Sequence, residues 1–364
     1  MRVLLLIFLL LPFFGSTAYA DDIYRQTAEE TGVYALEDLP EELRNISGAL
    51  EVDGSYDAGS ALQRLWKSFT ANVRRGLEDN LRSAAALVAI AVICALSGSV
   101  CSGKAIQEYI NIAGCCAAAL SLLGGVNSIV SQTVNALNQL YDYSKAALPA
   151  IFTAAAACGA VGSAAARYAA VCLALDVLMS LAQKLLIPMV YAYLSLALAA
   201  SVFPNSLLSN TARMVRWTAT TAMTIMTLAF SAYIGMTGLI SGSLDVVAIK
   251  TARTVISTSL PVVGGLISDA SAAVLSAAAV IKNSAGVFGL IAVCALCAGP
   301  FALLSVKMLV LKAAAAASNM VPNGRLSSLI ASVAAAMGLL LGLLGCCGIM
   351  LFISIMAGMK AVSL

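Results

Sequence analysis

Long apolar stretches separated by short polar ones make up most of the chain after residue 83. Several of them reach the roughly 20 residues that a membrane-spanning helix needs, whereas others are shorter or are interrupted by proline. The pattern therefore predicts an all-α, polytopic membrane protein with about six to eight spans and at least one broken or re-entrant helix pair. The apolar stretches are residues 84–101, 110–130, 147–166, 168–183, 185–203, 217–240, 255–281, 286–311 and 326–358, and the prolines are Pro149, Pro188, Pro261 and Pro300. Between the second and third stretches, residues 131–146 (SQTVNALNQLYDYSKA) predict a polar loop or a surface helix.

The first twenty residues have the pattern of a secretory signal peptide. One arginine is followed by an apolar run from Val3 to Phe14, and Ala18 and Ala20 precede the acidic Asp21. The run is short for a span, so we predict cleavage after residue 20, with an uncleaved first anchor as the alternative. In either case the next segment begins outside the cytoplasm.

Residues 21–83 predict a small, acidic extracytoplasmic segment that ends in an amphipathic helix. From Ser60 onward apolar residues recur at helical spacing with basic residues between them. Such a helix suits the membrane interface, and packing on its own ectodomain is the alternative. Residues 84–364 then form the multi-pass domain. The apolar positions are Leu62, Leu65, Trp66, Phe69, Val73 and Leu77.

Composition supports this division. The chain is 61% hydrophobic and only 11% charged, which excludes an ordinary soluble domain. Residues 21–82 hold 13 acidic and 7 basic residues, whereas residues 83–364 hold 5 acidic and 13 basic ones. Basic loops usually stay in the cytoplasm, yet Arg74, Arg75 and Arg82 flank the first span on the side that a signal peptide places outside. The two topology signals conflict.

The sequence lacks the residues of the common catalytic and cofactor sites. It has no histidine and no glycine-rich phosphate loop ending in Lys-Ser or Lys-Thr, so nothing in it indicates a triad, a histidine metal site or a means of using ATP. Its ten cysteines lie in or beside apolar stretches, and we interpret them as packing residues rather than as redox or metal ligands. We therefore predict no enzyme, no catalytic residue, no cofactor, no metal and no nucleic-acid partner.

Charged residues within apolar stretches are the better functional candidates, because a charge at the bilayer centre costs at least about 2.5 kcal/mol. For the lysines we expect snorkelling to the interface. The shorter aspartates Asp176 and Asp269 need internal partners or a wet cavity. The charged set is Asp176, Lys184, Asp245, Asp269, Lys282 and Lys307.

The stretch Ser259–Asp269 (SLPVVGGLISD) predicts a helix break inside the membrane. Pro261 disrupts the preceding helix, and Gly264 and Gly265 permit an unwound turn. Asp269 can then cap a new helix over residues 270–281, which at twelve residues is too short to cross alone. Half-helices of this kind build substrate or ion sites in transporters, and the alternative is that Asp269 is only a helix cap.

Small residues in the spans, such as Gly338 and Gly342 in a G-x-x-x-G pattern, let helices approach closely. This pattern indicates a compact bundle or a homo-oligomer.

The segment from Thr258 to Leu290, with its Pro261-x-x-Gly264-Gly265-x-x-Ser268-Asp269 and Ile281-Lys282-Asn283-x-x-Gly286 elements, resembles the stage III sporulation protein AE family. The resemblance extends over nearly the whole chain, from the signal-like start to the polytopic region. It implies a multi-pass protein of the mother-cell membrane around the engulfed forespore. It also implies a complex with other stage III sporulation proteins, including a secretion-type ATPase and ring-forming subunits, that meets stage II sporulation protein Q. Such a complex is expected to act as a channel or secretion apparatus that permits late forespore sigma-factor activity.

Three functions follow as hypotheses. The first is a non-enzymatic membrane component of that complex. The second is a free-standing secondary transporter whose site would include Pro261, Gly264, Gly265, Asp269, Lys282, Asn283 and Asp176 along the helix break and translocation path. The third is a structural anchor that recruits ring proteins through residues 21–83.

Overall fold

The computed structural model describes residues 58–100, 103–157, 161–203, 205–259, 264–319 and 324–359. The predicted signal peptide, most of the acidic segment and Pro261 lie outside these residues. The described part is helical throughout, with no strand among its residues, and six of its helical segments are long and apolar enough to cross a membrane. The prediction of an all-α, polytopic membrane protein is therefore confirmed, and the described residues alone supply six candidate spans.

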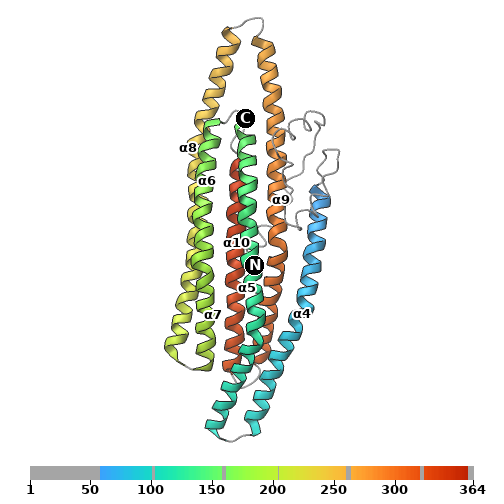
Figure 1. The fold of residues 1–364 in the computed structure, drawn as a ribbon, viewed down its shortest axis with the longest axis vertical. Coiled ribbons are helices and arrows are strands. Elements are labelled where there is room, and N and C mark those ends of the chain that lie inside the picture. Colours follow the sequence, from blue (N-terminus) through green and yellow to red (C-terminus); the bar gives the residue numbers. More distant parts are fainter. Residues whose placement is uncertain are drawn as a thin grey trace.

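The helices run up and down along one long axis (Figure 1). The chain passes along the bundle in α4, returns in α5, and passes again through α6, a short π-helical segment and α7. It then returns in α8, passes once more in α9 and ends in α10. The elements are α4 (Ala58–Val100), α5 (Lys104–Ala157), α6 (Val161–Leu181), η2 (Ala182–Leu186), α7 (Ile187–Val202), α8 (Ser206–Ser259), α9 (Gly264–Ser318) and α10 (Gly324–Met359).

The helices are longer than the apolar stretches of the sequence. Polar residues alone do not end a helix. Residues 131–146 belong to α5, so the surface helix was the correct alternative and the loop was wrong. Pro188 is accommodated by the π-helical turn before it, where the Ile187 N–H donates to the Ala182 carbonyl five residues back. Two apolar stretches thereby join into the continuous run α6–η2–α7.

Helix α10 lies at the centre of the bundle, with 56% of its candidate span buried, whereas α4 lies at the edge with 11%. Small residues allow the neighbours of α10 to come close. A Cβ on Gly338 would meet Met308 of α9, and a Cβ on Gly342 would meet Met223 of α8. The G-x-x-x-G pattern is therefore used for packing within the chain.

Helix α4 joins the predicted amphipathic helix to the first span without a break. A Cβ on Gly76 would lie 3.2 Å from Leu303 of α9, so this part of α4 packs along the bundle.

The predicted half-helix over residues 270–281 is wrong. Helix α9 begins at Gly264 and continues to Ser318, so Gly264 and Gly265 are its first residues and Asp269 lies in its second turn. Lys282 and Asn283 do not end it, and no proline follows until Pro300. The ends of α8 and α9 project past the neighbouring helices as two long antiparallel arms (Figure 1).

Candidate functional site

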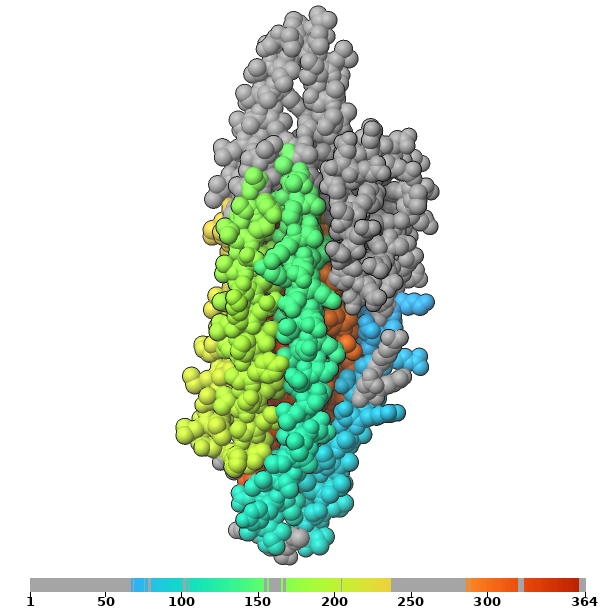
Figure 2. Space-filling view, in the orientation of Figure 1, coloured from blue at the N-terminus to red at the C-terminus, as the bar shows by residue number. Residues whose placement is uncertain are grey.

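Helix α5 carries a polar face on the outside of the bundle. Its buried positions are mostly apolar, with Thr133 as an exception, whereas its exposed positions between residues 127 and 142 are amides, hydroxyls and one carboxylate. They span 16 residues, or about 22 Å of helix. We call this set the α5 polar face: Asn127, Ser128, Ser131, Gln132, Asn135, Asn138 and Asp142. Figure 2 shows α5, in cyan to green, on the surface between α4 and the α6–α7 run.

The α5 polar face lies at the height of apolar segments of its neighbours. Lys307 of the α9 span donates from Nζ to the carbonyl of Gly125 at 2.9 Å, just before the polar face begins. A Cβ on Gly289, the other end of the α9 span, would meet Ile151 of α5 just beyond it. The polar face therefore runs alongside the segment of α9 between residues 289 and 307, which is among the most apolar in the chain.

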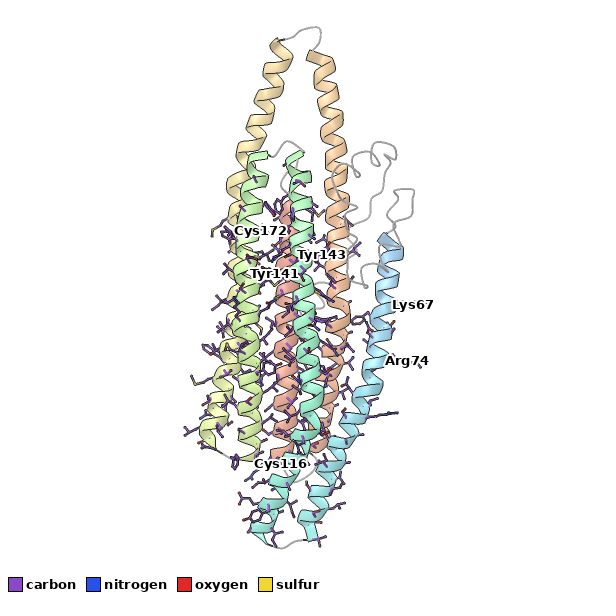
Figure 3. The ribbon with its side chains drawn as sticks, viewed as in Figure 1. Lys67, Arg74, Cys116, Tyr141, Tyr143 and Cys172 are labelled. Carbon is purple, nitrogen blue, oxygen red and sulfur yellow. The ribbon has the colours of Figure 1, made fainter. Side chains whose placement is uncertain are left out.

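Two polar contacts tie this part of α5 to the next helices. The Tyr141 hydroxyl donates to a carboxylate oxygen of Asp176 on α6, and Gln183 Nε2 donates to Asn138 Oδ1 at 2.9 Å. Lys145 Nζ stands 3.9 Å from the centre of the Tyr141 ring. Figure 3 shows Tyr141 of α5 beside Cys172 of α6, one turn from Asp176. The contacts are solvent-exposed in the isolated chain, so they form an outer polar seam between α5 and α6.

The sequence predicted internal partners or a wet cavity for Asp176. It has a partner within the chain, Tyr141, but both the contact and Asp176 lie on the outer surface. Its neighbours Leu173 and Val177 are 68% and 62% exposed. Apolar and polar side chains thus lie side by side at one height of the bundle.

The other predicted site residues lie elsewhere on the molecule. The contact between Gly289 of α9 and Ile151 of α5 serves as a reference height. Asp269 lies 20 residues, or about 30 Å, from it toward the start of α9, whereas Tyr141 lies about 15 Å from it in the opposite direction along the bundle. The structure therefore does not bring Asp176 and Asp269 into one site. Lys282 and Asn283 lie between Asp269 and Gly289 on the same helix, and their side chains, like that of Asp269, are outside the described residues.

Lys307 is the clearest departure from the expectation of snorkelling. It is only 8% exposed, and its Nζ points into the bundle toward Gly125 rather than to an interface. The physical reason is the missing side chain at Gly125, where a Cβ would lie 2.7 Å from Nζ. Lys184 is exposed, and its snorkelling stays a prediction.

In the described residues no group of His, Cys, Asp and Glu is placed to hold a metal ion, and the eight described cysteines are free. Sequence reasoning missed the α5 polar face as a site, although the amides of residues 131–146 were its signal.

The comparisons with known proteins agree with one another. The model of the family described as stage III sporulation protein AE matches residues 48–361. The stage III sporulation protein AE of Bacillus subtilis (strain 168) is 21% identical over 167 residues, which are 46% of this chain and 42% of that protein. The alignment thus spans less than half the length of this relative. No solved structure matches the chain.

Proposed function

Because the chain belongs to the stage III sporulation protein AE family, we propose that it is a non-enzymatic membrane component of a sporulation complex linking mother cell and forespore. The family match over most of the chain carries this proposal. In it, the protein is a multi-pass component of the mother-cell membrane around the forespore. It serves a channel or secretion-like assembly on which late forespore sigma-factor activity depends.

The α5 polar face supports a channel-type role. Amides that face hydrocarbon leave part of their hydrogen-bonding capacity unmet, and each unmet group costs on the order of 1–3 kcal/mol. A water-containing path shared with neighbouring subunits removes that cost along the whole 22 Å length, about two thirds of a hydrocarbon core. We infer that the α5 polar face lines such a path.

The location of this face favours a complex over a free-standing transporter. It lies on the outer surface of the chain, so one chain does not enclose a path and further subunits or second copies must complete it (Figure 2). The absence of a phosphate-binding loop from the sequence fits a subunit energised by a secretion-type ATPase partner. Ring-forming subunits, and through them stage II sporulation protein Q, would face the acidic extracytoplasmic segment.

The order of the helices gives the proposal a topology. If α4 enters the membrane from outside, as a signal peptide requires, the turns near residues 102, 204 and 321 face the cytoplasm, and the turns near residues 159 and 262 and the C-terminus face outside. Single cysteines at these turns, in a variant without native cysteines, are expected to react with an impermeant thiol reagent only on the outer side. Labelling of the turns near 102 and 204 from outside would contradict this topology.

The test of function uses a sporulating host in which the gene is deleted. We expect deletion to abolish late forespore gene expression, and the double variant Ser131→Leu with Asn135→Leu to lower it at least about tenfold. The amount of the variant in the membrane and its co-purification with the ATPase and ring proteins should equal those of the wild type, because both positions face outward. The matched control is Val177→Leu on the exposed apolar surface of α6, which should be silent.

Normal late forespore expression after deletion would overturn the sporulation role. Normal late forespore expression in the double variant would contradict the proposal that the α5 polar face lines a path, but not the proposal that the protein belongs to the complex. The transporter alternative predicts ion-dependent uptake by the chain alone in liposomes, abolished by Asp269→Asn, and we expect no such uptake. The anchor alternative predicts that residues 21–83 fused to an unrelated span restore function, and we expect that they do not.

A further inference from the structure

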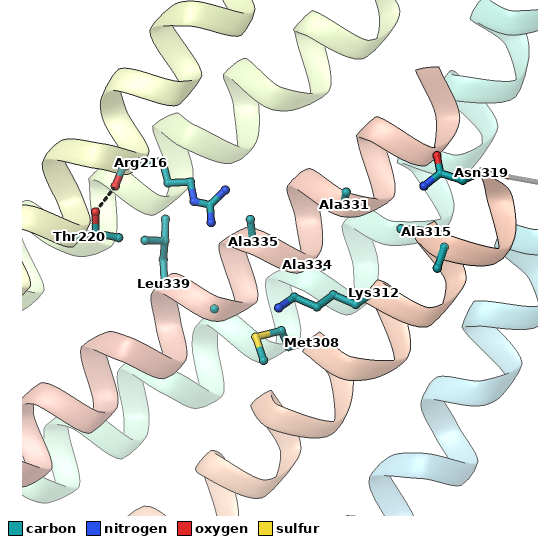
Figure 4. Close-up of a pocket in the computed structure, with 12 residues that line it drawn as sticks. Arg216, Thr220, Met308, Lys312, Ala315, Asn319, Ala331, Ala334, Ala335 and Leu339 are labelled. Carbon is teal, nitrogen blue, oxygen red and sulfur yellow. Dashed lines mark hydrogen bonds between the residues drawn. The ribbon is translucent and has the colours of Figure 1, made fainter. Parts of the chain in front are cut away.

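A groove of about 450 Å³ lies between α8, α9 and α10, toward the end of the bundle where α8 begins and α9 ends (Figure 4). It is separate from the α5 polar face. Its floor is made by small residues of α10, including Ala331, Ala334, Ala335 and Gly338.

The groove is positively charged. Arg216 of α8 and Lys312 of α9 reach into it from opposite walls, above the alanines of α10 (Figure 4). No carboxylate lines it, and in the part of the chain that the structure describes neither cation has an ion-pair partner. Two unneutralised cations on separate helices favour an anion that both can contact at once.

The two cations of the groove stand at the ends of apolar stretches, where side chains at a membrane interface are expected. Arg216 directly precedes the apolar stretch of α8 that starts at residue 217, and Lys312 directly follows the apolar stretch of α9 that ends at residue 311. Trp217, beside Arg216, is 67% exposed, and tryptophan is enriched at the headgroup level of membrane proteins. A bound anion would therefore sit at the headgroup layer.

The lining combines polar and apolar side chains. Arg216, Lys312, Thr220 and Asn319 are polar, whereas the alanines, Met308 and Leu339 are apolar. Two cations above an apolar trough match an amphiphile rather than a soluble anion.

We propose that this groove binds the phosphate headgroup of an anionic phospholipid. The phosphate lies between Arg216 and Lys312, and part of an acyl chain follows the Ala334, Ala335 and Gly338 floor. The inference goes beyond the sporulation role and rests only on the helices crossing a bilayer.

The experiment measures lipid binding to the full chain, purified in detergent, by native mass spectrometry. Phosphatidylglycerol and phosphatidylcholine are titrated against the wild-type protein and three variants. Each cation near an anionic lipid raises the binding affinity about fivefold. With two cations we expect phosphatidylglycerol to bind roughly thirtyfold more tightly than phosphatidylcholine. Arg216→Gln with Lys312→Gln should bring the ratio to within about twofold.

The matched control is Arg213→Gln, which removes a neighbouring exposed cation of α8 that does not line the groove and should keep the preference. Ala335→Leu fills the trough but leaves both cations, and it should weaken phosphatidylglycerol binding at least about tenfold. An equal preference in the wild type and the double variant would overturn the proposal. So would inorganic phosphate at millimolar concentration displacing all bound phosphatidylglycerol, since the site would then be a free-phosphate site, or full retention of binding in Ala335→Leu.

Discussion

Two faces of the bundle at the same height differ in character. The α5 polar face runs beside residues 289–307 of α9. On α8, the exposed side chains next to the central part of α10 are Ile225, Leu228 and Met236, each at least 60% exposed. We call these three residues the α8 apolar face. Met223 of α8 meets Gly342 of α10, while Gly345 meets Phe301 of α9, so both faces lie along the same segment of the core.

Mean hydropathy does not reveal this difference. The candidate span that contains the α5 polar face averages 1.7, whereas the one that contains the α8 apolar face averages only 1.3. The polar residues beside the α8 apolar face are threonines and a serine whose hydroxyls bond back to the carbonyl four residues earlier, as Thr224 does to Thr220 and Ser231 does to Thr227, so they need no outside partner. In α5 the exposed amides bond to other side chains rather than to a carbonyl of their own helix, as Gln132 donates to Ser128 Oγ at 3.4 Å and Asn138 accepts from Gln183. The distribution of polar groups over the faces, and how each is satisfied, decides what a face can contact.

The largest effect is expected from placing a charge on the α8 apolar face. Leu228→Asp should cost about 3 kcal/mol, because an aspartate replaces a leucine that faces hydrocarbon. Asn135→Asp on the α5 polar face should cost less than about 0.5 kcal/mol, because its environment is wet. The amount of each variant in purified membranes and its thermal aggregation temperature in detergent give the comparison. If Leu228→Asp and Asn135→Asp lowered the membrane amount and the aggregation temperature equally, the proposed difference between the two faces would be wrong.

The second prediction compares the effect on stability of substitutions on the buried side and on the exposed side of α5. Leu140 has no exposed surface, and Leu140→Ala should destabilise the protein by about 2 kcal/mol through lost packing. This cost is at the low end of the usual range for a buried Leu→Ala substitution, because the leucine of the unfolded helix also stays in lipid. Ser131→Ala, on the polar face, should lie within about 0.5 kcal/mol of the wild type. Unfolding in a detergent titration measures both, and a larger loss for Ser131→Ala would place that residue inside the fold.

The smallest effect concerns the seam between α5 and α6. Tyr141→Phe removes the donor to Asp176 and should cost about 1 kcal/mol, since the bond is exposed. Asp176→Asn should cost a similar amount, and the double variant should cost no more than either alone. A double-mutant cycle by detergent unfolding measures this coupling. Additive losses would show that the hydroxyl and the carboxylate act separately.

The sequence predicts the class of fold because span-length apolar stretches admit few alternatives. It does not predict the helix lengths, since whether Lys282 and Asn283 interrupt a helix depends on what packs around them. Lys307 shows the same limit: its burial depends on Gly125, which is 182 residues away along the chain. Asp176 could be singled out from its apolar surroundings, but the polar face beside it required knowing that residues 131–146 are helical and which of them point outward.

The central claim is that the α5 polar face contacts water rather than lipid in the assembled protein. The direct measurement is the reaction rate of a small, charged methanethiosulfonate reagent with single cysteines in native membranes of sporulating cells. The background variant lacks the native cysteines and must still support sporulation. A thiol in hydrocarbon neither ionises nor meets the reagent. We therefore predict that Asn135→Cys reacts at least about tenfold faster than Leu228→Cys, whereas equal or slower reaction of Asn135→Cys would contradict the account.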